Sequence, residues 1–75
     1  MEEEVFFGEV IWFNVECGYG FISWEKDEIK QDDMFCYYTD INQDGFKQLK
    51  AQEKVSFELG SNNSGKPKAV NITIL

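Results

Sequence analysis

The chain has 75 residues, of which 43% are hydrophobic and 28% charged, and its net charge is −7. A chain of this length forms one domain with a small core, and this composition predicts a folded globule rather than a disordered segment. No apolar run approaches the roughly 20 residues that span a bilayer. The acidic start, Met1-Glu2-Glu3-Glu4, has the wrong charge for a secretory signal. We therefore expect a cytoplasmic protein without membrane association.

The charge is strongly one-sided, with fourteen acidic residues against seven basic ones. Nucleic-acid-binding domains usually present a basic face that neutralises phosphates, so the charge alone argues against that class. The acidic clusters at residues 2–4 and 25–33 are expected to be solvated surface, because their spacing does not fit a calcium-binding loop.

The residues available for chemistry are few. There are two cysteines, Cys17 and Cys36, and no histidine. Two thiols without further ligands do not make a structural zinc site, and a nucleophile paired with histidine cannot be built. No paired carboxylates at catalytic positions and no phosphate-cradling G-x-x-x-x-G-K loop are present. We expect two free thiols, one in a turn and one in a core strand, with no metal, no cofactor and no enzymatic activity.

The chain begins with an expected disordered tail at residues 1–4. Residues 5–14 are rich in β-branched and aromatic side chains and predict a long strand. Gly8 inside that strand indicates a bulge, a bend or a close backbone approach. Residues 14–18 have turn chemistry and residues 19–24 predict a second strand, so the two strands form a hairpin.

Alternation along these strands assigns side chains to faces. In the first strand it places Val10 and Trp12 on one face and Ile11 and Phe13 on the other, unless a bulge shifts the parity. In the second strand one face carries Tyr19, Phe21 and Ser23 and the opposite face carries Gly20, Ile22 and Trp24.

A polar loop at residues 25–33 leads to a third strand at residues 34–38. Met34 and Cys36 are expected to face the core, so the alternate residues of this strand lie on the other side. The matching parity predicts four rings on one surface, namely Tyr19, Phe21, Phe35 and Tyr37.

The remaining segments are shorter. Residues 39–42 are expected to form a single helical turn, capped by the hydroxyl of Thr39 or the carboxylate of Asp40. Strands are predicted at residues 54–59 and 69–74. The inward residues expected here are Ile41, Leu49, Val55, Phe57, Leu59, Val70, Ile72 and Ile74. Between the two strands, residues 60–68 contain Gly, Ser, Asn and the only Pro, which indicates a flexible loop.

Five short strands without a long helix or a repeat predict an all-β fold. They are too few for a two-sheet sandwich, so we expect a five-stranded antiparallel OB-fold barrel, partly open. Trp24 and Phe57 are expected in its core. The four rings of the predicted surface cannot all be buried in so small a domain, and an exposed aromatic patch usually marks an interaction site.

The pattern resembles the cold-shock domain family, small OB-fold proteins that bind single-stranded RNA and DNA. The resemblance runs from Gly8 to about Ile74 and rests on six segments in the right order and spacing. These are G-E-V-I-W-F-N at 8–14, C-G-Y-G-F-I at 17–22, M-F-C-Y-Y at 34–38, D-G-F-K-Q-L at 44–49, K-V-S-F at 54–57 and A-V-N-I at 69–72.

The resemblance implies sequence-tolerant binding of single-stranded RNA or DNA, with a pyrimidine-rich strand as the expected partner and RNA-chaperone activity as the expected role. It also implies that residues 1–75 are one such domain, expected to be a monomer. Asn14 would hydrogen-bond a base edge or the backbone. The implied stacking surface comprises Trp12, Phe13, Tyr19, Phe21, Phe35, Tyr37, Tyr38 and Phe46.

The sequence also departs from the family pattern. Ile11 stands where the family usually has lysine, and Cys17 stands where its first RNP motif usually opens with a basic residue. Tyr37 and Tyr38 stand where His-Phe is expected. The rings are retained while nearby cations are lost, so the alternative function is a cold-shock-like domain repurposed for protein interaction. A protein partner is therefore left open.

Overall fold

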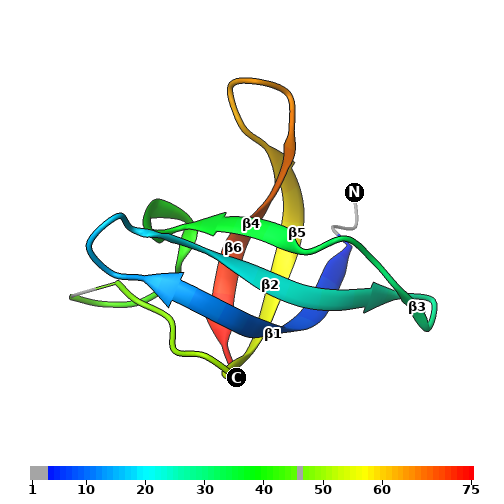
Figure 1. Ribbon diagram of the computed structural model, residues 1–75, viewed down its shortest axis with the longest axis horizontal. Coiled ribbons are helices and arrows are strands. Elements are labelled where there is room, and N and C mark those ends of the chain that lie inside the picture. Colours follow the sequence, from blue (N-terminus) through cyan, green and yellow to red (C-terminus); the bar gives the residue numbers. More distant parts are fainter. Residues whose placement is uncertain (1–3, 46) are drawn as a thin grey trace.

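The computed structural model describes residues 4–45 and 47–75 and shows a strand-built barrel (Figure 1). Within those residues the elements are β1 (Val5–Asn14), β2 (Tyr19–Lys26), β3 (Ile29–Lys30), β4 (Met34–Tyr37), the 3₁₀ turn η1 (Tyr38–Asp40), β5 (Lys54–Ser61) and β6 (Pro67–Ile74). Most of the tail expected at residues 1–4 lies outside the described residues. None of the described residues belong to a helix long and apolar enough to cross a membrane.

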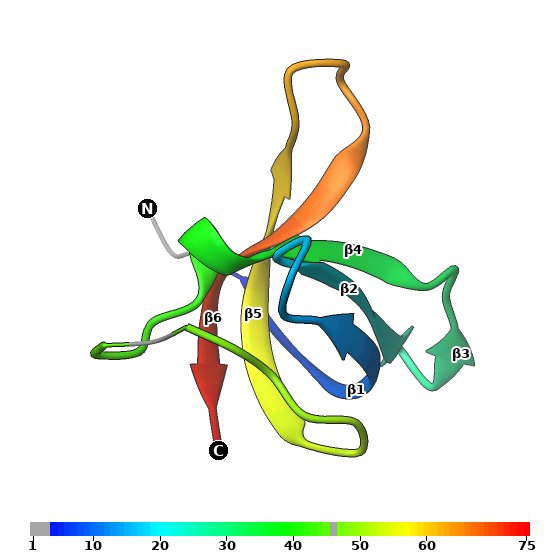
Figure 2. The same cartoon turned by 60° about the vertical axis from the view of Figure 1, so that its left-hand side comes forward.

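The barrel closes because β1 is long enough to pair with two partners. Its first half pairs with β5 and its second half pairs with β2, giving the order β1-β5-β6-β4-β2 and back to β1. β1, β2 and β4 lie side by side and cross β5 and β6 (Figures 1 and 2). The predicted five-stranded OB-fold barrel is confirmed. One junction differs from the expected antiparallel arrangement, since β4 and β6 pair in parallel at Cys36 and Ala69.

Gly8 is needed where β1 passes from one partner strand to the other. A Cβ at this position would lie 2.5 Å from Cγ2 of Ile22 and 2.8 Å from the carbonyl oxygen of Ser23. Both distances are shorter than real Cβ contacts. The close backbone approach predicted from the sequence is therefore present, and it lets β1 pack directly over the core.

The core fills the barrel with side chains from the inner face of each long strand. Trp24 and Phe57 are buried, as predicted, with ring centroids 5.6 Å apart in an edge-to-face arrangement. Phe6 joins them, 5.1 Å from Trp24. The other buried apolar residues among those described are Val10, Ile22, Met34, Cys36, Ile41, Leu49, Val55, Ala69 and Ile72.

Two expected inward residues near the β5–β6 hairpin point elsewhere. Register shifts between Ser56 and Glu58, opposite the positive-φ residue Asn71, so the parity of β6 changes there. Ala69 is therefore buried in place of Val70, which is only partly buried. Leu59 is exposed, because this hairpin extends away from the barrel (Figures 1 and 2).

The predicted polar loop at residues 25–33 contains a second small hairpin. β3 pairs with the end of β2, and the turn residues Asp27 and Glu28 both have positive φ, 54° and 65°. Positive φ at both central residues is the signature of a type I′ turn, whose twist matches that of the flanking strands. The sequence carries no glycine here, which is why the turn was not expected.

The helical turn begins one residue earlier than predicted. Tyr37 is its N-cap, and neither Thr39 nor Asp40 provides the expected side-chain cap. Asp40 instead lies 3.0 Å from the ammonium group of Lys68 and ties η1 to β6. Ile41 is buried as predicted and forms a parallel bridge with Ile72.

The close approach at Gly8 gives a stability prediction. Gly8→Ala should lower the free energy of unfolding by about 1–3 kcal/mol, the usual cost of overpacking a filled core. Chemical denaturation monitored by tryptophan fluorescence measures the change. Ser61→Ala, at the exposed end of β5, is the control and should change stability by less than about 0.5 kcal/mol. A Gly8→Ala variant as stable as the native chain would show that β1 does not need this contact.

Candidate nucleic-acid interface

The register between β2 and β4 brings four rings to one surface. Tyr19 lies opposite Tyr37 and Phe21 lies opposite Phe35, so all four project from the outer face of the barrel. Phe35 lies between the others: its ring centroid is 5.8 Å from that of Tyr19 and 5.9 Å from that of Phe21. The shared surface predicted from parity is confirmed. Each ring is only partly exposed, because its neighbours cover its edges.

Trp12 joins this surface because of a bulge. The register of β1 shifts between Val10 and Trp12, with Ile11 as the extra residue. Val10 is buried while Trp12 is 41% exposed, so the expectation that they share a face is wrong. The indole lies 5.6 Å from the ring of Tyr19 and 5.5 Å from that of Phe21. A bulge re-aims one side chain, and here it turns the tryptophan outward.

The same register shift turns the side chain of Phe13 inward. It is partly buried and packs against the core, and its ring lies beside Gly20 on the inner side of β2. A Cβ on Gly20 would collide with the carbonyl oxygen of Trp12. The structure therefore does not bring Phe13 among the surface rings, although the sequence placed it there.

Tyr38 extends the surface at its other end. Its side chain is 42% exposed and its ring centroid is 4.8 Å from that of Tyr37. The backbone N–H of Tyr38 donates to the carbonyl oxygen of Gly18 at 2.8 Å. Gly18 has φ 79°, and a Cβ there would meet the Tyr38 ring at 2.6 Å. The glycine thus lets the β1–β2 turn close against the ring.

We call the set of Trp12, Tyr19, Phe21, Phe35, Tyr37 and Tyr38 the aromatic surface. Beside Tyr38 lies a surface hollow of about 510 Å³, lined in part by Cys17, Gly45 and Lys47. Phe46, the last predicted stacking residue, lies outside the described residues.

Asn14 shapes the turn that leads into the surface. Its side-chain oxygen accepts hydrogen bonds from the backbone N–H groups of Glu16 at 2.9 Å and Cys17 at 3.0 Å. The side chain is exposed, and these bonds use only its oxygen, so the amide nitrogen is the group that a bound base could reach. The predicted base contact of Asn14 stays a prediction.

Few cations border the aromatic surface. Lys66 and Asp33 line a hollow of about 400 Å³ against Phe21 and Phe35. Lys30 reaches the outer face of β2, where it donates to the hydroxyl of Ser23 at 2.9 Å. Lys30 belongs to the polar loop predicted at residues 25–33. It reaches this face because β3 folds back against the end of β2 in a turn that has no glycine to signal it. Among the described residues, no cluster of three or more potential ligands could hold a metal ion.

Comparison with known proteins agrees with this geometry. The family described as the 'Cold-shock' DNA-binding domain matches residues 6–75. The chain belongs to this family. A cold shock-like protein CspD of Bacillus cereus is 46% identical over 66 residues, covering 88% of this chain and 92% of that protein. The major cold shock protein of Streptococcus pyogenes serotype M1 is 44% identical over 68 residues, covering 91% of this chain and 94% of that protein.

Similarity also reaches a longer plant protein. Cold shock domain-containing protein 4 of Arabidopsis thaliana is 38% identical over 66 residues, which cover 88% of this chain but 31% of the plant protein. Membership of the cold-shock domain family supports nucleic-acid binding in general.

The two thiols of this cold-shock domain differ sharply in environment. Both are free, Cys17 exposed in the turn and Cys36 buried in β4, as predicted. The pKa of the Cys36 thiol is raised from 9.0 to about 12, mainly because the group is buried; a hydrogen bond with the backbone of Gly20 lowers it in part, and the nearby Asp40 carboxylate adds a smaller upward shift. The folded state therefore retains this thiol proton at pH values where the unfolded chain releases it. As a result, the free energy of unfolding falls as the pH rises from 9 towards 12.

This difference predicts selective thiol labelling. Since the thiolate is the reactive form, an aromatic disulfide reagent at pH 8 should modify Cys17 quickly and Cys36 only after the protein unfolds. The released chromophore counts the modified thiols, and Cys17→Ser should abolish the fast phase. Rapid modification of two thiols in the folded protein would contradict the burial of Cys36.

Proposed function

We propose that the chain binds unpaired bases of single-stranded RNA or DNA by stacking them on the aromatic surface. The observation that carries this proposal is the continuous contact of six rings across β1, β2, β4 and η1, with neighbouring centroids between 4.8 and 6.5 Å apart. Every base has a π-face, so such a surface tolerates any sequence. Pyrimidine-rich strands are the preferred partner, because weak preferences of this kind follow from stacking and backbone flexibility.

Stacking supplies enough energy for useful affinity. Each base on an aromatic ring contributes about 1–3 kcal/mol. Three or four such contacts, after the cost of association, support binding in the micromolar range or tighter. A protein of this kind acts as an RNA chaperone by mass action, since it binds the open form of a hairpin and not the paired form.

Charge contributes little to this binding. The lysine usual in the family is absent at Ile11, which is 40% exposed beside Trp12, and Cys17 replaces the other expected cation. Phosphate neutralisation releases counterions and makes affinity depend on salt. With neutral side chains at both positions, the bases carry more of the affinity than the phosphates do.

The stacking proposal predicts the effect of removing rings. Replacing Tyr19, Phe21 and Phe35 together by Ala should leave the fold intact and weaken binding of a pyrimidine-rich oligonucleotide by at least about 100-fold, since each ring contributes at least about 1 kcal/mol. Quenching of tryptophan fluorescence measures binding, and circular dichroism verifies the fold. Leu59→Ala, an exposed apolar residue outside the aromatic surface, is the matched control and should bind normally.

Unchanged affinity in the folded triple variant would rule out the aromatic surface as the binding site. If saturating oligonucleotide at low salt leaves the tryptophan fluorescence of the native protein unchanged while the protein dimerises, the domain is a protein-interaction module and our proposal is wrong.

A second prediction concerns salt. The plot of log affinity against log salt should have a slope shallower than about −2, corresponding to fewer than three neutralised phosphates. Ile11→Lys should raise affinity at low salt and steepen the slope by about 0.7, the effect of one more phosphate contact on a single strand. Leu59→Lys adds the same charge away from the rings and is the control. An unchanged slope in Ile11→Lys would show that no phosphate passes this position.

A further inference from the structure

The outer face of β1 and β2 continues past the aromatic surface into a groove. Beyond the pair of Trp12 with Phe21, the next pair on this outer face is Glu9 with Ser23, because the pair between them, Val10 with Ile22, is buried. The groove has a volume of about 460 Å³. The residues that matter here are Phe7, Glu9, Ser23, Glu25, Lys30 and Lys54, all of which line it.

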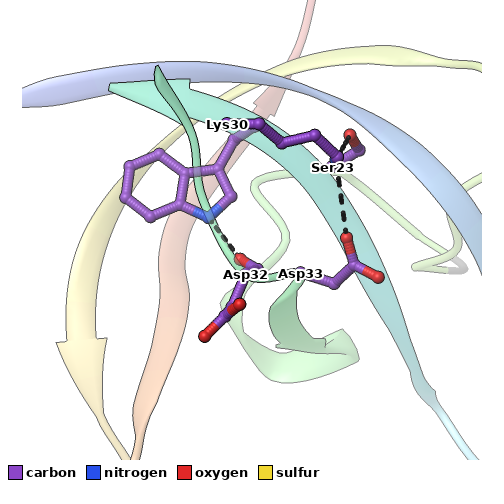
Figure 3. Close-up of polar contacts among 5 residues, drawn as sticks. Ser23, Lys30, Asp32 and Asp33 are labelled. Carbon is purple, nitrogen blue, oxygen red and sulfur yellow. Dashed lines mark hydrogen bonds and ion pairs between the residues drawn. The ribbon is translucent and has the colours of Figure 1, made fainter. Parts of the chain in front are cut away.

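Two lysines from different parts of the chain converge on this groove. Lys30 donates to the hydroxyl of Ser23 at 2.9 Å and lies 3.9 Å from the carboxylate of Asp33 (Figure 3). Lys54 lies 2.9 Å from the carboxylate of Glu9. Their side chains are 66% and 70% exposed. Ion pairs this exposed are weak, so a phosphate can recruit either ammonium group at small cost.

The β3 hairpin fixes the position of Lys30. The backbone N–H of Gln31 donates to the carbonyl oxygen of Trp24 at 3.0 Å. The indole N–H of Trp24, itself buried in the core, donates to the carbonyl oxygen of Asp32 at 2.9 Å (Figure 3). These two bonds hold Gln31 and Asp32, the residues that follow Lys30, against β2. Lys30 itself pairs with Glu25 of β2, and its amino group reaches the hydroxyl of Ser23 on the sheet face.

The groove also offers a ring. Phe7 is 64% exposed, although exposed aromatic side chains are unfavourable in water. It projects from the outer face of β1, on the side opposite the buried Phe6 and two residues before Glu9. A ring beside two cations has the composition of a single-strand-binding groove, in which bases stack while the backbone is neutralised.

We propose that this groove, which we call the lysine groove, is an additional subsite for single-stranded nucleic acid, where Lys30 and Lys54 contact phosphates and Phe7 stacks one base. The inference rests on the proposed function, since the occupant is the same strand that lies on the aromatic surface. Continuity of the two surfaces and the charge of the two ammonium groups favour this occupant. Glu9 and Glu25 also border the groove and limit its affinity for an isolated phosphate, so the subsite acts only on a strand already held by the rings.

The test is a length series. Native protein should bind thymidine oligonucleotides more tightly as they lengthen from three to ten nucleotides, within the range of about 4–16 that one OB fold covers. In the Lys30→Gln/Lys54→Gln variant, affinity should stop rising once the aromatic surface is filled. The salt slope for the longest oligonucleotide should become shallower by about 1.4, the effect of two phosphates. Phe7→Ala should weaken the longest oligonucleotide roughly 5- to 150-fold and leave the shortest unchanged.

The controls separate local contacts from total charge. Lys26→Gln/Lys50→Gln removes the same number of charges from residues outside the groove and should behave as native protein, apart from a small uniform loss. Lys30→Arg/Lys54→Arg should restore the length dependence. Equal affinity and salt slope in the native and Lys30→Gln/Lys54→Gln proteins at every length would overturn the lysine groove while leaving stacking intact. If native protein binds no oligonucleotide at any length, both proposals fail.

Discussion

The pairing of β2 with β4 determines which side chains this protein shows to its surroundings. Side chains alternate along a strand, so one register fixes the face of every residue in the pair. Here that register sends Ile22, Met34 and Cys36 into the core and leaves the rings of Phe21 and Phe35 outside. A slip by one residue would bury rings in a barrel too small for them and expose the aliphatic core. The same burial that stabilises the fold therefore also fixes the aromatic surface.

Sequence alternation predicted this pairing well because both strands are regular. It failed where the chain inserts a residue. The extra Ile11 in β1 reverses the faces of Trp12 and Phe13, and the positive-φ residue Asn71 does the same in β6. A bulge changes two-residue periodicity without changing composition, so nothing in the pattern marks its position. Alternation alone put Trp12 on the face of Val10, whereas the structure buries Val10 and leaves the indole exposed beside Tyr19 and Phe21.

Other features depend on contacts between distant segments. The β3 hairpin uses Asp27 and Glu28 at positive φ, where glycine or asparagine is the usual signal, so it was not predictable from turn chemistry. The parallel pairing of β4 with β6 depends on closure of the whole barrel. Lys30 reaches Ser23 only because that hairpin forms, so the position of this cation could not be read from the loop sequence.

The net charge of −7 is compatible with a nucleic-acid-binding surface because of where the charges lie. Two of the acidic residues that border the rings and the lysine groove face ammonium groups, Glu9 that of Lys54 and Asp33 that of Lys30. A carboxylate that already faces an ammonium group repels a phosphate less than an isolated one, and salt at physiological concentration screens the remaining charges beyond roughly 8 Å. On the proposed stacking model the domain holds bases firmly and phosphates loosely, so its affinity should depend more on whether a strand is unpaired than on how much charge the strand carries.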